Sequence, residues 1–211
     1  MFVGHTGAGK TTHIRAAFSE LKKEGYGVYK THAKTVFLIT MLLSALKLLQ
    51  RITWRLAVAL DLILNSILLP LKIWFRTVLV PLLIKKQVVL IEEHLLGSLV
   101  DYFHAALLLN LTSIALPTLR TLFMLSRISM WDAMVYVTCD KEFLSQRWAK
   151  RGTPPESRTY LLSQDFIFTI LLKNISSNDV LYIDTTMEFN YNRHKVKKFI
   201  LYKLRTSLGA R

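Results

Sequence analysis

The sequence predicts an α/β protein whose parallel sheet carries helices on both faces, and three observations lead to this fold class. Short apolar runs rich in β-branched residues recur along the chain, as expected of strands buried on both faces of a sheet. Stretches whose apolar residues have helical spacing separate these runs. A glycine-rich turn joins the first run to the first helical stretch. Alternating strands and helices are typical of a parallel sheet covered on both sides.

The expected strands are 1–3, 88–91, 133–138 and 180–183, and a weaker one opens at 27–29. The first helix is expected after Thr12, because its apolar residues recur at i, i+3, i+4 and i+7, namely at Ile14, Ala17, Phe18 and Leu21. Gly25 is a natural stop for this helix. The later helices are expected at 95–109, 141–150, 159–173 and through 196–204, and Asp140 is expected to cap the one that begins near Lys141.

Length and charge limit the classes of protein that the chain can belong to. Its 211 residues suit one domain, 1–211, with a buried core. Its 28 Lys and Arg residues against 14 Asp and Glu residues give a net charge of +14, which favours an anionic partner such as phosphate, nucleotide or a membrane surface. The single cysteine, Cys139, cannot form an intrachain disulfide, so we expect a cytoplasmic protein.

The apolar character of the chain raises the question of a membrane span. Hydrophobic residues make up 52% of the sequence, and the most apolar region is 36–84. A spanning helix needs roughly 20 predominantly apolar residues, whereas the longest charge-free run of this region, 35–46, has twelve. Asp61 and two prolines interrupt the apolar stretch after this run, and no signal peptide is visible. We therefore expect helices that are buried in the protein or paired with another subunit.

The segment 4–11, GHTGAGKT, matches the phosphate-binding loop pattern G-x-x-x-x-G-K-[ST]. Its glycines allow positive φ, and its backbone N–H groups converge on an anion. Lys10 is expected to contact the β- and γ-phosphates, and the Thr11 hydroxyl to ligate Mg²⁺. Nine residues are expected to bind the nucleotide, which we expect to be ATP: Gly4, His5, Thr6, Gly7, Ala8, Gly9, Lys10, Thr11 and Thr12.

An acidic pair, Glu92 and Glu93, follows the expected strand 88–91. A phosphate-loop enzyme needs a carboxylate at a neighbouring strand end to hold Mg²⁺ or its water. Because side chains alternate along a strand, one of the two faces the site, and we favour Glu92 as the metal ligand and catalytic acidic residue. The alternative is a solvated pair of carboxylates.

A basic segment at 147–158 is expected to form a lid. Arg147 and Arg151 lie four residues apart, on one face of the expected helix. Gly152 and the two prolines after it turn the chain into a loop. Positioned arginines neutralise charge on a transferring phosphoryl group, so we expect both to be catalytic. The alternative is a solvated basic helix end.

These motifs, at 4–12, 81–93, 135–152 and 180–186, resemble those of thymidylate kinases, within the nucleoside-monophosphate kinase group. The resemblance implies a P-loop NTPase fold with a five-stranded parallel sheet. It also implies an Mg²⁺-dependent reaction in which the γ-phosphoryl group of ATP is transferred to dTMP, giving dTDP. In the family, the segment between the second and third strands holds the acceptor-binding helices, and here that segment is 36–84.

The chain departs from the family at the acceptor side. The family's Asp-Arg pair is Glu92-Glu93 here, its Arg-Glu-Pro is His32-Ala33-Lys34, and one of its arginines falls at Leu71. Glu92 can replace the aspartate, whereas Glu93 brings negative charge where a phosphate-binding arginine is expected. Three residues are candidates for the missing positive charge: Lys34, Lys72 and Arg76. The alternative is an acceptor other than dTMP.

A basic stripe runs along the apolar region, since Lys47, Arg51 and Arg55 recur at i, i+4 and i+8. It is interpreted as the solvated face of a core or homodimer helix, as an acceptor-phosphate site, or as an interfacial helix on an anionic membrane. The sequence thus supports two hypotheses: a nucleotide kinase, or a membrane-associated or oligomeric ATP-binding protein with another acceptor or none. No nucleic-acid motif is present, so nucleic acid is not an expected partner.

Overall fold

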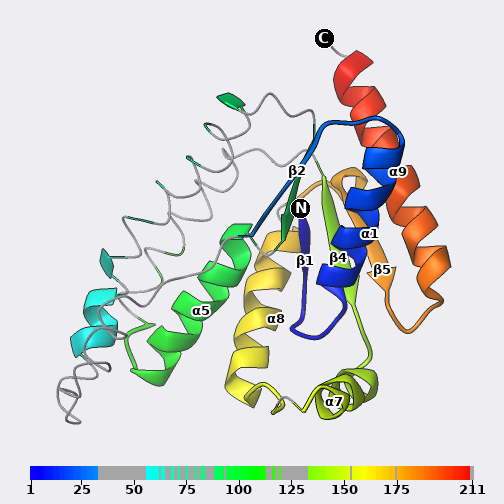
Figure 1. The fold of residues 1–211 in the computed structure, drawn as a ribbon. Coiled ribbons are helices and arrows are strands. Elements are labelled where there is room, and N and C mark those ends of the chain that lie inside the picture. Colours follow the sequence, from blue (N-terminus) through cyan, green and yellow to red (C-terminus); the bar gives the residue numbers. More distant parts are fainter. Residues whose placement is uncertain are drawn as a thin grey trace.

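The computed structural model describes residues 1–32, 88–92, 94–112, 133–152, 154–173 and 175–209, with short stretches between 56 and 83 and the single positions 116 and 119. Within them, five strands form one sheet in the order β2-β3-β1-β4-β5 (Figure 1). Every neighbouring pair runs parallel. The predicted α/β fold with a five-stranded parallel sheet is confirmed.

The strands are β1 (Phe2–Gly4), β2 (Val28–His32), β3 (Val88–Glu92), β4 (Met134–Thr138) and β5 (Val180–Asp184). The helices are α1 (Lys10–Lys23), α5 (His94–Leu108), α7 (Lys141–Lys150), α8 (Arg158–Lys173) and α9 (Phe189–Gly209), with a 3₁₀ turn at Ser177–Asp179. Strand β2 opens where expected and continues to His32, pairing with β3 along its whole length, from Val28 opposite Val88 to His32 opposite Glu92.

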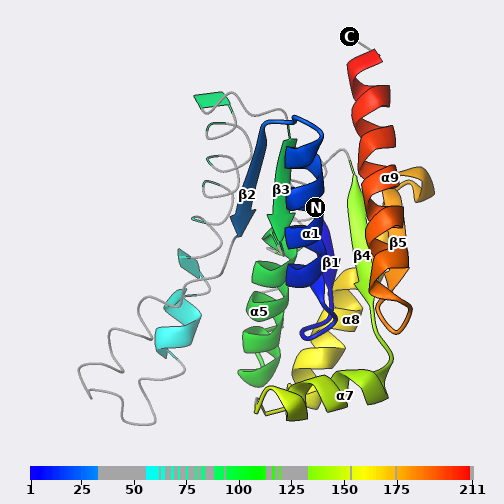
Figure 2. The ribbon, with the colours of Figure 1, turned by 45° about the vertical axis from the view of Figure 1, so that its right-hand side comes forward.

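Side chains that alternate along the strands pack into two apolar cores, one on each face of the sheet. Phe2 and Val135 belong to the core that also contains residues of α1 and α9. Val3 and Met134 belong to the opposite core, which contains residues of α5 and α8. Figure 2 shows the two helix layers with the sheet between them. Burial on both faces explains why β1, β3 and β4 are mostly apolar runs.

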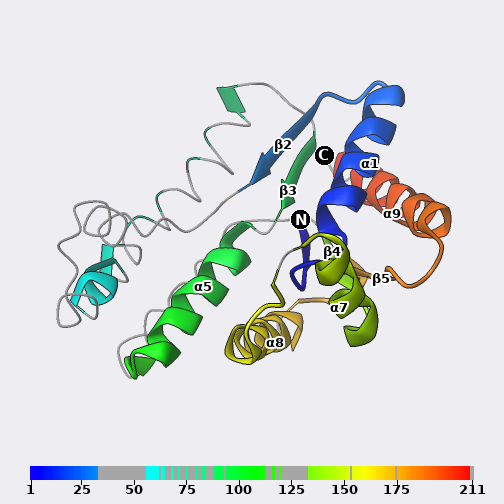
Figure 3. The same cartoon turned by 60° about the horizontal axis from the view of Figure 1, so that its bottom comes forward.

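Helix α7 lies across the carboxyl end of the sheet, where the loop between β1 and α1 also lies (Figures 1 and 3). The predicted cap is confirmed, since the Asp140 carboxylate accepts a hydrogen bond from the backbone N–H of Glu142 at 2.8 Å. In open parallel sheets, ligands bind at the carboxyl ends of the strands. This edge is therefore where a site is expected.

The described residues contain no helix that is both long enough and apolar enough to cross a membrane. Most of the apolar region 36–84, including Lys47, Arg51 and Arg55, lies outside the described residues. Lys34, Lys72, Arg76 and Glu93 lie outside them as well. The three interpretations of the basic stripe therefore stay predictions.

The end of β1 comes unusually close to β4. Gly4 has φ 149°, and a Cβ at this position would lie 2.0 Å from the carbonyl oxygen of Val137. Such a separation is far below any van der Waals contact, so a side chain at Gly4 would force the two strands apart. Only glycine allows β1 to enter the loop at this point.

We predict that Gly4→Ala destabilises the fold much more than Gly25→Ala. Gly25 also has positive φ, at 87°, but a Cβ there meets nothing within 4 Å. Its substitution therefore adds backbone strain alone, about 1–2 kcal/mol, whereas Gly4→Ala adds overpacking and should cost about 2–5 kcal/mol in all. Urea unfolding followed by circular dichroism measures both. Equal losses of unfolding free energy would contradict the proposed crowding at Gly4.

Candidate nucleotide-binding site

The loop between β1 and α1 has the backbone geometry of an anion-binding turn. Gly7 and Gly9 have φ of 86° and 97°, and Gly9 is the left-handed cap of α1. Helix α1 begins at Lys10, because the left-handed Gly9 turns the chain directly into the helix. The N–H groups of a first helical turn have no partner four residues earlier. Together with the helix dipole, they make this end of α1 attractive to phosphate.

Helix α7 packs directly on this loop. A Cβ at Gly7 would lie 2.8 Å from the indole nitrogen of Trp148, a buried residue of α7. Gly7 is therefore required both for its positive φ and for the close approach of Trp148. The predicted loop and the predicted lid helix are in contact, although they lie far apart in the sequence.

The side chain of Lys10 curls back over the loop. Its ammonium donates hydrogen bonds to the carbonyl oxygens of Gly4 and His5 at 2.8 and 2.7 Å. The residue is 6% exposed, so its charge lies at the loop rather than in bulk water. The backbone N–H of Ala8 was expected to point at an anion, but it donates to the carbonyl oxygen of His5 at 3.1 Å instead. Its amide is thus used within the loop.

The structure brings together the two expected metal ligands. The Thr11 hydroxyl donates a hydrogen bond to the carboxylate of Glu92, which is 7% exposed. The Lys30 ammonium on β2 lies 3.6 Å from the other carboxylate oxygen. A hydroxyl and a carboxylate are hard oxygen ligands of the kind that Mg²⁺ accepts beside water and substrate phosphates. These residues therefore fit Mg²⁺.

Arg147 of α7 reaches across the loop to the segment after β5. Its guanidinium donates to the hydroxyl and the carbonyl oxygen of Thr185 at 2.9 and 2.8 Å. The Thr185 hydroxyl also lies within hydrogen-bond distance of the carbonyl oxygens of Ala8, at 2.8 Å, and Thr138, at 3.1 Å. Thr185 therefore joins β4, the loop and α7 at one point.

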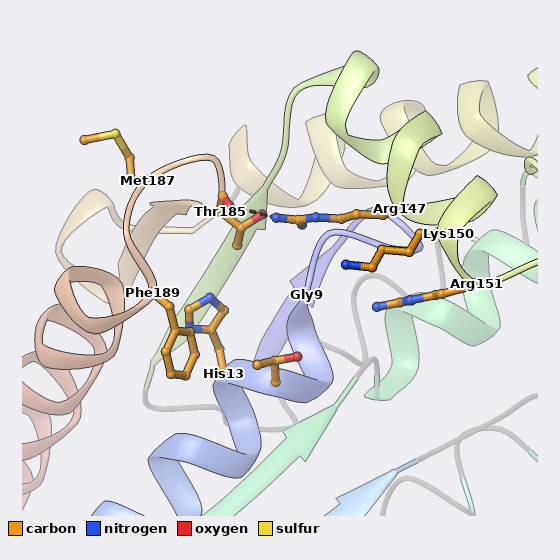
Figure 4. Close-up of a pocket in the computed structure, with 9 residues that line it drawn as sticks. Gly9, His13, Arg147, Lys150, Arg151, Thr185, Met187 and Phe189 are labelled. Carbon is orange, nitrogen blue, oxygen red and sulfur yellow. Dashed lines mark hydrogen bonds between the residues drawn. The ribbon is translucent and has the colours of Figure 1, made fainter.

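A pocket of about 320 Å³ opens beside these residues (Figure 4). Arg147, Lys150 and Arg151 extend into it from the α7 side, and its other lining residues come from α1, the loop and the segment after β5. The remaining lining residues are Gly9, Thr12, His13, Thr185, Met187 and Phe189. No carboxylate is among the described lining residues, so the pocket attracts anions.

His13 and Phe189 form an aromatic wall of the pocket. Their ring centroids lie 5.3 Å apart, with planes inclined by 38°. Burial, and to a smaller extent the positive charge of Arg147, lowers the pKa of His13 below its usual value of 6.5. The imidazole is therefore neutral at pH 7, with one nitrogen as donor and the other as acceptor.

Helix α8 holds the loop from the opposite side. The Gln164 amide donates to the Thr6 hydroxyl at 3.1 Å, and the next residue, Asp165, lies 2.7 Å from the imidazole of His5. Two adjacent loop residues are thus tied to two adjacent residues of α8. His5 and Thr6 have structural partners in addition to their expected place in a phosphate site.

The structure places the predicted residues of the loop, Glu92, Arg147 and Arg151 at one edge of the sheet. Six further residues of this edge were not predicted: His13, Lys30, Lys150, Thr185, Met187 and Phe189. One signal for Thr185 was available, since it directly follows Asp184, the acidic end of an apolar run, as Glu92 is the acidic end of the run of β3. Arg158, at the expected end of the lid, begins α8 and is not among the described lining residues of the pocket.

No protein-family model matches this chain, and no curated protein matches it either. The resemblance to thymidylate kinases therefore depends on the motifs themselves. The motif segments 4–12, 135–152 and 180–186 and the strand 88–92 lie on described residues, whereas Glu93 does not.

We predict that Thr185→Val destabilises the protein by about 1–3 kcal/mol, because it leaves buried oxygen and guanidinium groups without their shared hydroxyl. Thr206→Val is the matched control, since among the described residues the Thr206 hydroxyl bonds carbonyl oxygens of its own exposed helical turn alone. Chemical unfolding of both variants measures the difference. Equal small losses would show that the Thr185 junction does not stabilise the fold.

We also predict that stability falls as the pH drops below 6.5, in part through His13. Just below this value the unfolded chain binds a proton at His13 that the folded chain does not, because the folded pKa is lowered. The unfolding free energy therefore rises with pH between the folded and the unfolded pKa of His13, and it falls as the pH is lowered from 6.5 into this range. Urea midpoints at pH 7.5 and 5.5 should shift less in His13→Gln than in the native chain, and an equal shift would contradict the prediction.

Proposed function

We propose that this chain is a nucleotide kinase that transfers the γ-phosphoryl group of ATP to a nucleoside monophosphate, with dTMP as the first acceptor to test. One observation carries the proposal: Lys10, Thr11, Glu92 and Arg147 converge around the loop at the carboxyl end of the sheet. A proton-transfer pair or a nucleophile is not needed for such a reaction, since phosphoryl transfer depends on positioning and charge.

The loop and α1 supply the binding of the triphosphate. The backbone N–H of Gly7, those from Gly9 to Thr11 and the positive end of α1 would hold phosphate oxygens, since the N–H of Ala8 is used within the loop. Lys10 places its charge on the β- and γ-phosphates, after exchanging its carbonyl partners in the loop for phosphate oxygens. Lys10 would accelerate the transfer because the negative charge on these oxygens is redistributed in the transition state, where its ammonium stabilises that charge.

Thr11 and Glu92 would hold Mg²⁺, directly or through its water. The ion, when bound, neutralises charge on the β- and γ-phosphates. The contact between Thr11 and Glu92 keeps both side chains at the mouth of the loop. Lys30 keeps a positive charge beside the same carboxylate, on strand β2. Lys30 would supply part of the positive charge that the acceptor motifs lack.

Arg147 and Arg151 supply positive charge from the lid side. Arg147 already points at the loop, with its guanidinium 3.4 Å from the carbonyl oxygen of Gly7. Arg151 ends α7 and lines the pocket with Lys150. With ATP bound, these side chains would neutralise charge on the transferring group and help exclude water. A cytoplasmic location is part of the proposal, since the single cysteine, Cys139, is a free thiol.

The decisive experiment is an ADP-release assay with Mg²⁺ and ATP against the full panel of nucleoside monophosphates. Turnover with dTMP alone supports the thymidylate kinase assignment, and turnover with another monophosphate redefines the acceptor. Absence of turnover with every member, by a protein shown to be folded, would overturn the kinase proposal. Equilibrium binding of ATP, measured in parallel, separates loss of catalysis from loss of nucleotide binding.

We predict that Lys10→Ala lowers kcat by about 100-fold or more, because it removes a fixed charge from the transition state. Lys23→Ala is the matched control, since Lys23 lies on the same helix and its side chain is 70% exposed. Lys10→Arg, which keeps the charge but not its position, should recover little activity. Circular dichroism checks the fold of each variant. Full activity in Lys10→Ala would exclude Lys10 from catalysis.

A further inference from the structure

Helix α9 has two sides that differ in chemistry. Its inner side is apolar and packs on the core through the buried residues Val196 and Ile200. Figures 1 and 2 place the helix at the margin of the molecule. Its outer side is exposed and combines basic and aromatic residues, with His194 just beside them: Tyr191, Lys195, Lys198, Tyr202 and Arg205. We call these five residues the basic face of α9.

The basic face is a straight stripe along the helix. Its residues recur at i, i+4, i+7, i+11 and i+14, counted from Tyr191. At 3.6 residues per turn these positions lie within about 80° of the helix circumference, and at 1.5 Å per residue they extend over about 21 Å. The two lysines lie between the two tyrosines, and the arginine ends the stripe. Aromatic rings and cations are therefore interspersed along one line.

The protein does not neutralise the cations of this stripe. Helix α9, from Phe189 to Gly209, contains no Asp or Glu. Cations on its other sides have carboxylate partners, as in the contact of Lys203 with Asp179 at 2.5 Å and in the ion pairs with α1. Within the described part of the chain, neither Lys198 nor Arg205 is paired with a carboxylate. Their charge is left for an anionic partner.

The tyrosines of the basic face are largely uncovered by the protein. Tyr191 is 56% exposed and Tyr202 is 60% exposed. The Lys195 ammonium lies 5.9 Å from the centroid of the Tyr191 ring, and it donates a hydrogen bond to the carbonyl oxygen of Tyr182 at 3.4 Å. A cation is thus held beside an exposed ring. An exposed aromatic ring can stack on a nucleic-acid base, and every base has a face suited to such stacking.

This chemistry distinguishes among the possible anionic partners. A helix that lies on a membrane inserts an apolar face into the lipid, whereas the apolar side of α9 is buried in the core and the basic face contains no aliphatic residue. A nucleic-acid duplex keeps its bases stacked inside, so it offers phosphates alone to such a stripe. A single strand offers phosphates to the cations and bases to the tyrosines.

From this arrangement we infer that the basic face of α9 binds a single-stranded polynucleotide. Its length matches about six nucleotides at 3.4 Å each. The inference is independent of the proposed kinase reaction, because it concerns a different helix face from the residues that surround the phosphate loop. The sequence alone did not predict this partner, since the stripe is recognisable only when the apolar side of the helix is known to be buried.

The stacking part of the inference is tested by fluorescence anisotropy with a labelled oligouridylate of about twelve nucleotides, a length within the site sizes of single-strand binders. Excess Mg²⁺–ATP is present as a competitor for the phosphate loop. Tyr202→Ala should weaken binding about tenfold, as expected for the loss of one stacked base. Tyr202→Phe keeps the ring and should bind like the native chain. Circular dichroism checks that both variants are folded.

The charge part is tested by the salt dependence of the same binding. Replacing Lys198 and Arg205 together by Gln should lower the slope of log affinity against log salt by about 1.4, because each phosphate contact on a single strand contributes about 0.7. The matched control replaces Lys22 and Lys141 by Gln, which removes the same charge from exposed positions of α1 and α7. The control should leave the slope unchanged.

Four outcomes would overturn the inference. The native chain could fail to bind the oligonucleotide, or lose it to excess ATP, which would assign the binding to the phosphate loop. The control pair could lower the slope as much as the pair on α9. A duplex of the same length could bind more tightly than the single strand. Flotation with phosphatidylserine vesicles, without binding of the oligonucleotide, would make the basic face a membrane surface. None of these results bears on the ADP-release assay, so the kinase proposal is tested separately.

Discussion

The structure depends on the close approach of β1 to β4 at Gly4. A Cβ there would lie 2.0 Å from the carbonyl oxygen of Val137, so only a glycine at position 4 lets the central strand β1 continue into the loop. One residue further along β4, the carbonyl oxygen of Thr138 accepts a hydrogen bond from the backbone N–H of Thr185 at 3.0 Å. The loop, β4 and the segment after β5 are thus fixed to one another by backbone groups. The side chains that define the candidate site are positioned on this frame.

In the described part of the chain, two groups of charged residues have different surroundings. On the outer side of α1, Glu20 is bound by Arg193 and by Lys197, whose ammonium also lies 2.5 Å from Glu24. These ion pairs join α9 to α1, and there the positive charges are paired with carboxylates. At the carboxyl edge of the sheet, in contrast, the pocket has three cations and no carboxylate among its described lining residues. Positive charge is therefore left unbalanced at the edge where an anion is expected.

Much of this edge could be predicted from sequence, because its main parts are local. The loop is a contiguous motif, β3 is an apolar run that ends at Glu92, and Arg147 and Arg151 share a helix face. The residues that were missed depend on contacts between distant segments. Thr185 meets Arg147 only because β4 and β5 are paired, and His13 meets Phe189 only because α9 returns to α1. Lys30 was hidden within a strand whose register with β3 brings it beside Glu92.

The contacts of α8 with the loop have a mechanical consequence for the chain between α7 and α8. Gln164 and Asp165 fasten one end of this connection to Thr6 and His5, while Arg147 fastens the other end to Thr185. Both helices that flank this connection are therefore anchored, α8 to the loop itself and α7 to the segment that also bonds the loop through the Thr185 hydroxyl. The two helices keep their places at the carboxyl edge of the sheet through side chains that lie far apart in the sequence.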